Sequence, residues 1–218
     1  MITQQYGKIK RVFNKSFFIF FEKFVPKNEK NSVAEIFQEN SKNKDESLAK
    51  LKLYLVLKAL IKKKRSRFGM LVVYNWKKEW FENFASFPDS DQNLFHDKNF
   101  DFLNASFDKS LEVFSSMSDF DGAIILSNKG LIIASGVYLE KMDPKSVAAK
   151  ITERKFSDLS EAYGFSNKVH TRHLSGIACS YKLDNTTVFA ISEEDGSLRA
   201  FEKGKIVFST IKKEIVSE

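Results

Sequence analysis

Cysteine and histidine are scarce in this sequence of 218 residues, which contains one cysteine and three histidines. A single cysteine excludes an internal disulfide and a Cys-x-x-Cys metal clip. Cys179 ends the apolar run Gly176-Ile177-Ala178-Cys179, so we interpret it as a small buried residue rather than a nucleophile. Three scattered histidines do not provide an all-histidine zinc site.

Proline and glycine are also few, with three and nine residues, whereas phenylalanine occurs 22 times. This composition favours long helices and packed strands over a loop-rich protein, and no internal repeat is visible. With 43% hydrophobic residues, the chain can bury one good core. A single α/β domain with a small appendage is therefore the starting hypothesis.

No long hydrophobic run is present. The candidate run Phe17–Phe21 is bracketed by Lys15, Glu22 and Lys23, and it is much shorter than the roughly 20 apolar residues that a membrane-spanning helix needs. We interpret it as an amphipathic helix packed on the protein itself, with a peripheral contact to a membrane surface or to a partner as the alternative. No cleavable signal peptide is visible, so we expect a cytoplasmic protein.

Basic residues are concentrated at the beginning of the chain. Residues 1–67 carry 17 Lys/Arg and 6 Asp/Glu, a net charge of +11, whereas residues 68–218 have a net charge of −4. Such an excess can attract nucleic acid or anionic lipid. The cluster Lys62–Arg65, however, follows a leucine-rich helix and suits the negative end of its dipole. Because the sequence has no recognisable groove-reading motif, a nucleic-acid partner is not expected.

The pattern of hydrophobic runs predicts an α/β fold with a mixed β-sheet of about six or seven strands surrounded by helices. We interpret the polar stretch 40–45 as a linker between a basic, aromatic N-terminal helical extension (1–45) and one domain (46–218). The region 75–101 predicts a loop with short helical turns. Strands are predicted at 68–74, 123–126, 131–134, 186–192, 197–201 and 205–208, and helices at 46–64, 107–117, 144–153 and from just after 171–173 to 181.

A carboxylate stands directly before one of these strands, in the motif Asp121-Gly122-Ala123. Strand ends are where open α/β sheets place ligands, and a glycine there allows a ligand to approach closely. A carboxylate in such a place can bind a metal or accept a proton from a hydroxyl. The alternative is an ordinary turn aspartate, because Asp-Gly-Ala alone is a common tripeptide.

Two further polar segments fit an anionic ligand. Thr171-Arg172-His173 precedes a predicted helix, which would place a hydroxyl, a guanidinium and free amides at a positive helix end. The turn Ser192-Glu193-Glu194 adds an alcohol and two carboxylates after a strand, which could hold a phosphate contact and Mg²⁺ or Mn²⁺. A surface helix cap and a pair of solvated glutamates are the respective alternatives.

These segments, in this order, resemble the motifs of the diadenylate cyclases, whose DAC (DisA_N) domain carries Asp-Gly-Ala followed by Arg-His-Arg. The likeness covers about residues 46–210, in which 68–74 is similar to an early strand of that domain and 190–205 to its Ser-Glu-Glu-x-Gly hairpin. It implies condensation of two ATP molecules into cyclic di-AMP (c-di-AMP), with release of two pyrophosphates. It also implies two domains that face each other in a homodimer or higher homo-oligomer.

The resemblance implies a role for each motif residue. Asp121 would assist deprotonation of the 3′-hydroxyl of ATP and hold Mg²⁺ or Mn²⁺, with Glu193 and Glu194 supporting the metal. Tyr138-Leu139 resembles the pair that meets adenine in several members, and a core tyrosine is the alternative. The implied catalytic residues are Asp121, Arg172 and His173, and the implied ATP contacts are Gly122, Ala123, Tyr138, Leu139, Thr171, Ser175 and Ser192.

Three positions depart from the family's usual residues: Phe120 stands where some members have a metal-binding histidine, Glu140 replaces the proline that often follows Tyr-Leu, and Leu174 alters the Arg-His-Arg motif. Leu174 stands where the second arginine of Arg-His-Arg would be, which removes one phosphate-binding charge unless His170, Lys168 or Arg199 replaces it. The alternative to an active cyclase is therefore a nucleotide-binding sensor of the same fold that has lost turnover.

Overall fold

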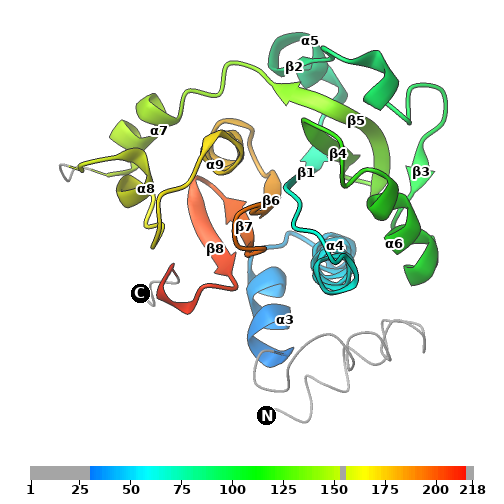
Figure 1. Cartoon of the computed structure of the whole chain (residues 1–218), viewed down its shortest axis with the longest axis horizontal. Helices are drawn as coiled ribbons and strands as arrows, with labels where there is room; N and C mark the ends of the chain where they lie inside the picture. Colours follow the sequence, from blue (N-terminus) through cyan, green and yellow to red (C-terminus); the bar gives the residue numbers. More distant parts are fainter. Residues whose placement is uncertain (1–29, 153–155, 215–218) are drawn as a thin grey trace. The chain divides into compact units, whose positions relative to one another are not determined.

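The structure, a computed structural model, describes residues 30–152 and 156–214 (Figure 1). The chain divides into two compact units. The first contains the chain up to Arg65 together with Asn104–Ser115, and the second contains Ser66–Leu103 and the chain from Ser116 onward. The predicted division after residue 45 stays a prediction, and residue 45 lies in the first turn of the helix Lys44–Lys63.

The first unit is helical in its described part. Phe37 and Tyr54 come from two successive helices of this unit and are both buried, with ring centroids 6.1 Å apart. A third segment, remote in sequence, joins them where the Lys52 ammonium donates to the Ala105 carbonyl at 2.6 Å. The helices are α3 (Lys30–Glu39), α4 (Lys44–Lys63) and α6 (Phe107–Ser116), of which all but the last residue lies in this unit.

The polar stretch between α3 and α4 is a tight turn. Asn43 caps α4, because its side-chain oxygen accepts a hydrogen bond from the Glu46 amide at 2.9 Å. The Asn40 carbonyl accepts a hydrogen bond from the buried Lys50 ammonium. Most residues of this stretch are exposed, and two of them also satisfy a helix end and a buried charge, so its role as a linker stays a prediction.

The second unit contains a mixed sheet of eight strands in the order β2-β5-β4-β1-β6-β7-β8, with β3 paired to β5. Only the β1–β4 pair among these is parallel. The strands are β1 (Met70–Trp76), β2 (Ala85–Ser86), β3 (Phe100–Asp101), β4 (Ala123–Ser127), β5 (Leu131–Leu139), β6 (Thr187–Ile191), β7 (Leu198–Glu202) and β8 (Lys205–Ser209). The helices are η1 (Lys78–Trp80), α5 (Phe81–Phe84), η2 (Ser90–Gln92), α7 (Pro144–Ile151), α8 (Leu159–Ala162), α9 (Thr171–Lys182) and η3 (Lys212–Glu214).

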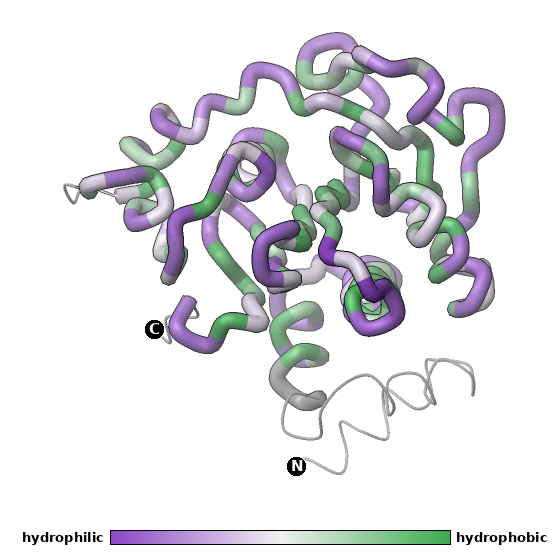
Figure 2. The backbone as a smooth tube through the Cα atoms, in the orientation of Figure 1, coloured by the Kyte–Doolittle hydropathy of each residue, from purple (hydrophilic) through white to green (hydrophobic). Residues whose placement is uncertain are grey.

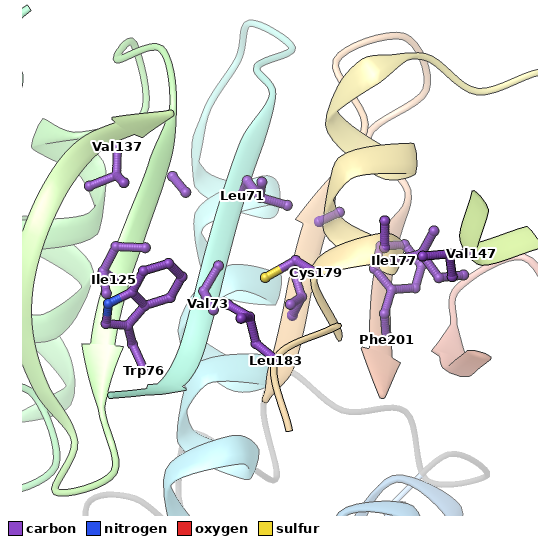
Figure 3. Packing of buried hydrophobic residues seen from close by; sticks show 14 of the residues in the cluster. Leu71, Val73, Trp76, Ile125, Val137, Val147, Ile177, Cys179, Leu183 and Phe201 are labelled. Atoms are coloured by element: carbon purple, nitrogen blue, oxygen red, sulfur yellow. The ribbon is translucent and has the colours of Figure 1, made fainter. Parts of the chain in front are cut away.

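Helix α9 packs on this sheet through an apolar face. Ile177 and Cys179 of α9 are fully buried in one cluster with Leu71 and Val73 of β1 and Phe201 of β7 (Figure 3). Burial raises the pKa of the Cys179 thiol to about 12, so the sulfur stays protonated at neutral pH. The interpretation of Cys179 as a small buried residue is confirmed.

Hydrophobic residues are concentrated in the strands of the sheet (Figure 2). Figure 2 shows hydrophobic residues gathered along the central strands and hydrophilic residues on much of the connecting chain at the rim. Every residue of β6 and of β7 is buried. The apolar runs that predict strands therefore mark the interior of the sheet.

The α/β fold with a mixed sheet is confirmed. The predicted strands 123–126 and 131–134 pair as β4 and β5, with Gly130 at a φ of +71° in the turn between them, and Asp143 caps α7 by accepting from the Ser146 amide. The strands β2 and β3 were not predicted. Each has two residues, which is too short to produce an alternating pattern.

No helix in the described part of the chain is long and apolar enough to cross a membrane. The Phe17–Phe21 run, for which a peripheral contact was an alternative, lies outside the described residues. A cytoplasmic location therefore stays a prediction.

Candidate functional site

The Asp-Gly-Ala motif lies where β4 begins, with Ala123 as the first residue of the strand. Ala123 is in register with Leu71 of β1 and with Val137 of β5. The motif therefore lies at the amino ends of the parallel strands β1 and β4, whereas open α/β sheets usually bind ligands at the carboxyl ends of parallel strands. The antiparallel strands β5 and β6 bring their carboxyl ends to this same edge.

A pocket of about 250 Å³ at this edge brings together motifs that are far apart in the sequence. Asp121 from the start of β4 and Thr171 from the start of α9 both line it. Sequence reasoning missed Leu71 and Val137, because an apolar strand residue carries no signal that it faces a pocket. The lining residues are Leu71, Asp121, Gly122, Ala123, Val137, Tyr138, Leu139, Thr171, Arg172 and Ser175.

A second pocket, of about 390 Å³, lies beside the first. Arg172 lines both pockets, so its side chain forms part of the wall between them. The two pockets together contain every residue predicted to bind ATP or metal or to act in catalysis. The second is lined by Val169, His170, Arg172, His173, Ser192, Glu193 and Glu194.

A positive φ and the close approach of β5 both require a glycine at position 122. Its φ is +81°, in the left-handed region that favours glycine. A Cβ atom there would lie 2.7 Å from the carbonyl carbon of Gly136 and 2.8 Å from the amide nitrogen of Val137. A side chain at this position would therefore push β5 away and open the pocket wall.

Arg172 lies directly against Gly69, the residue before β1. A Cβ atom at Gly69 would lie 1.8 Å from Nη1 and 2.2 Å from Cζ of Arg172. The guanidinium also lies 3.7 Å from the carboxylate of Glu193, and the Arg172 side chain is 30% exposed. Gly69 therefore provides the space that sets the position of the guanidinium, a function that its sequence context did not indicate.

The first turn of α9 presents backbone donors to both pockets. His170 occupies the N-cap position but makes no capping bond with its side chain. Its carbonyl accepts from the amides of His173 and Leu174, while the amides at the very start of a helix point outward. With the Thr171 hydroxyl and the Arg172 guanidinium beside them, these donors suit a phosphate.

His173 lies behind this helix start and is only 5% exposed. Its Nε2 atom lies 3.1 Å from Nη1 of Arg199. Because a guanidinium can only donate, Nε2 accepts and the ring proton is on Nδ1. Burial, followed by the charges of Arg199 and Arg172, lowers the pKa of His173 to about 4. The ring is therefore neutral at pH 7, and its Nε2 is not available as a base.

Arg199 is held by a buried carboxylate. Its Nε and Nη2 atoms donate to Glu214 at 2.7 and 2.8 Å, and the two side chains are 2% and 0% exposed. Of the residues considered as replacements for the missing arginine, Arg199 is thus occupied, and Lys168 lines neither pocket. His170 lies 2.9 Å from Glu194 in an exposed ion pair.

We expect His173 to make the fold sensitive to mild acid. The folded pKa of about 4 lies below the ordinary value of 6.5, so the unfolded chain binds more protons between these values and stability falls as the pH falls. Between pH 7.5 and 5 the free energy of unfolding should drop by about 2 kcal/mol from this residue. Urea titrations of wild type and His173→Gln at both pH values measure it.

The control for this experiment is His96→Gln, since the His96 side chain is 81% exposed. This variant should keep the wild-type dependence on pH, whereas His173→Gln should show about 2 kcal/mol less loss on acidification. An unchanged slope in His173→Gln would contradict the buried neutral state of this ring.

The carboxylates do not gather into one metal-binding cluster. Asp121 lines the first pocket, whereas Glu193 and Glu194 line the second. No group of three or more His, Cys, Asp or Glu side chains able to hold a metal occurs among the described residues. Mg²⁺ is commonly held by one or two carboxylates together with substrate phosphates, so Asp121 alone fits such an ion when a nucleotide is present.

Sequence reasoning assigned no role to Asp195, which follows Glu194 of the second pocket in the chain. Burial would raise the pKa of its carboxyl, but hydrogen bonds with Ser197 and Ser192 outweigh this and lower it. Asp195 is therefore ionised at neutral pH. Its contact with Ser192 engages the hydroxyl that was predicted to reach the triphosphate.

Tyr138 is 45% exposed at the end of β5, so the alternative of a core tyrosine does not describe it. Its backbone is held by pairing with Ser86 of β2. The ring lines the first pocket beside Leu139, where an aromatic face can stack on a planar ligand.

Comparisons with known proteins give weak similarities. No family model matches the sequence, and no curated protein matches it. A solved structure titled as a hypothetical membrane spanning protein from Bacillus cereus is 18% identical, with a TM-score of 0.44, over 71% of this chain and 59% of that one. A double mutant of DacA from Staphylococcus aureus is 21% identical, with a TM-score of 0.45, over 78% of this chain and 89% of that one. The chain thus spans less than two thirds of the Bacillus cereus protein.

Proposed function

We propose that the chain is a diadenylate cyclase, which converts two ATP molecules into cyclic di-AMP and two pyrophosphates. The observation that carries the proposal is that Asp121 and the first turn of α9 line the same pocket. A carboxylate can accept the proton of a hydroxyl, and helix amides with a guanidinium can stabilise charge on a phosphate. The motif resemblance supplies the identity of the nucleotide.

In the proposed reaction the 3′-oxygen of one ATP forms a bond to the α-phosphorus of the other. The bond from that phosphorus to the oxygen bridging it to the β-phosphate breaks, and its electron pair leaves with pyrophosphate. The proton of the 3′-hydroxyl passes to the Asp121 carboxylate. A second step of the same kind closes the ring. Because each chain would present one ATP, two copies must face each other.

The remaining lining residues position the nucleotide. Thr171, Ser175 and the Arg172 guanidinium would donate to phosphate oxygens, and Tyr138 would stack on adenine. Mg²⁺ or Mn²⁺ held by Asp121 and the phosphates would neutralise charge on the reacting phosphate. The protein mainly supplies position and electrostatics, as phosphoryl-type transfers require, and no protein nucleophile takes part.

The proposal is tested by incubating the purified protein with ATP and Mn²⁺ or Mg²⁺ and separating the products. The expected products are cyclic di-AMP and pyrophosphate in a ratio of one to two. Conversion of ATP into products other than cyclic di-AMP, or no turnover with either metal, would overturn it. The mass of the protein with bound nucleotide, compared with that of the free protein, measures whether two chains come together.

A Gly69→Ala variant should weaken ATP binding about tenfold, because its Cβ displaces the Arg172 guanidinium. The three nearest atoms to that Cβ all belong to Arg172, and Gly69 does not require a left-handed backbone. ATP affinity measured by calorimetry should therefore show the loss without a matching loss of thermal stability.

A double-mutant cycle separates this effect from a general disturbance. If Gly69→Ala acts through the guanidinium, it should have almost no further effect on ATP affinity in an Arg172→Met background. Additive losses in the two variants would show that Gly69 acts by another route.

The second candidate is a nucleotide sensor without turnover. The observation that favours it is that Leu174 is half-buried and packs against the hydrophobic cluster, so it brings no charge to the phosphates. Binding of ATP or cyclic di-AMP without product formation, in the presence of either Mg²⁺ or Mn²⁺, would identify a sensor.

A further inference from the structure

Gln92 contacts the acid motif from a segment that the sequence predicted to be a loop. It ends the short helix η2, and its Oε1 atom accepts a hydrogen bond from the backbone amide of Asp121 at 2.8 Å. On its other side, Nε2 donates to the carboxylate of Asp89 at 2.9 Å. The side chain thus links a carboxylate of its own segment to the backbone of Asp121.

Only one orientation of the Gln92 amide satisfies both neighbours. The Asp121 amide can only donate, so it needs the carbonyl oxygen of Gln92, and the Asp89 carboxylate oxygens accept, so they need the NH₂ group. Asp89 is itself fixed, since its other oxygen accepts from the Asp91 amide at 3.1 Å. The direction of the acceptor toward Asp121 is therefore determined by Asp89.

The segment that carries Gln92 is anchored to β5. The buried Ser135 hydroxyl donates to the Gln92 carbonyl at 2.5 Å, and the Ser135 amide donates to the side-chain oxygen of Asn93 at 3.2 Å. The next residue, Gly136, has a φ of +67°, and a Cβ atom there would lie 2.7 Å from Cβ of Gln92. The irregular pairing between β4 and β5 at this point thus makes room for Gln92.

We propose that Gln92 is a positioning residue that fixes Asp121 at the mouth of the first pocket. Asp121 precedes β4 and its side chain is exposed, so regular strand pairing does not hold its backbone. In place of strand pairing, the Asp121 amide donates to the side-chain oxygen of Gln92, whose orientation is set by Asp89. The consequence for turnover rests on the proposed function, because it requires Asp121 to act on the 3′-hydroxyl of ATP.

The test uses Gln92→Met in the full chain, which keeps the length and packing of the side chain but removes both hydrogen bonds. Asn93→Ala is the matched control, since it loosens the same segment from the same strand without touching the Asp121 amide. Two quantities are measured: the hydrogen-exchange rate of the Asp121 amide by NMR, and kcat and KM for ATP with Mn²⁺.

In Gln92→Met we expect the Asp121 amide to exchange about tenfold faster, as loss of one such hydrogen bond allows. We expect kcat to fall about tenfold with KM for ATP unchanged, since a misplaced carboxylate affects the reacting state more than nucleotide binding. In Asn93→Ala, the exchange rate of the Asp121 amide and kcat should both stay close to the wild-type values.

Unchanged exchange at Asp121 in Gln92→Met would overturn the proposal whatever the activity, as would equal acceleration in Asn93→Ala. A rise in KM for ATP with unchanged kcat would also overturn it. If the exchange result holds but wild type makes no cyclic di-AMP, the positioning of Asp121 stands and the proposed function fails. The two failures are thus distinguishable.

Discussion

An Asp121→Asn variant is expected to lose about a hundred- to ten-thousandfold of the rate of cyclic di-AMP formation, because asparagine has the same size but cannot accept the hydroxyl proton. It also offers a much weaker ligand to Mg²⁺ or Mn²⁺. The hydrogen bond from Asp121 to Gln92 uses the backbone amide, which the substitution keeps. The variant should therefore fold as wild type does and keep its other contacts to ATP.

The measurement is a single-turnover reaction with saturating ATP and Mn²⁺, accompanied by calorimetric ATP binding. Asp119→Asn provides a matched control, because it makes the same chemical change two residues earlier at a position that lines neither pocket. This control should retain activity. An active Asp121→Asn variant would remove Asp121 from the reaction, and equal loss in both variants would indicate a disturbed loop.

The places of the predicted site residues at the ends of helices and strands could be inferred from the sequence because they lie in short motifs beside apolar runs. Asp121 directly precedes an apolar strand, and Thr171 opens a helix, so both were placed at element ends by pattern alone. That they line one pocket follows from the pairing of β1 with β4 and from the packing of α9 against β1 and β6. The spacing of the motifs did not determine these contacts.

Contacts between distant segments could not be predicted. Gly69 precedes a strand like many glycines, and only the folded chain brings the Arg172 guanidinium against it. Gln92 lies in a region without hydrophobic period, so no pattern linked it to Asp121. The capping role of Asn43 was not recognised for the same reason, because polar residues that cap a helix resemble those of a solvated linker.

The prediction with the largest effect on stability concerns the buried pair of Arg199 and Glu214. A Glu214→Ala variant should lose about 3–5 kcal/mol of the free energy of unfolding, because it leaves a buried guanidinium without its carboxylate. Glu214 also accepts from the Ser209 hydroxyl at 2.6 Å and from the Ser166 amide at 3.1 Å. Removing it therefore leaves several donors unpaired at once. Urea titration at pH 7.5 measures the loss.

An exposed ion pair supplies the control. Lys109 and Glu112 lie 3.0 Å apart with side chains 55% and 69% exposed, so Glu112→Ala should change stability by about 0.5 kcal/mol or less. Comparable losses in Glu112→Ala and Glu214→Ala would contradict the assignment of a buried pair.

A double variant decides whether the loss comes from the stranded charge or from lost packing. Arg199→Met with Glu214→Leu removes both charges and keeps apolar volume, so it should be more stable than Glu214→Ala by about 1 kcal/mol or more.

The same double variant removes the donor to Nε2 of His173. Since Arg199 is also a cause of the low pKa of His173, the acid sensitivity assigned to that ring should weaken in the double variant. Retention of the full wild-type acid sensitivity would mean that burial and Arg172 keep His173 neutral without Arg199, and that the Arg199–Glu214 pair stabilises the fold without tuning this histidine.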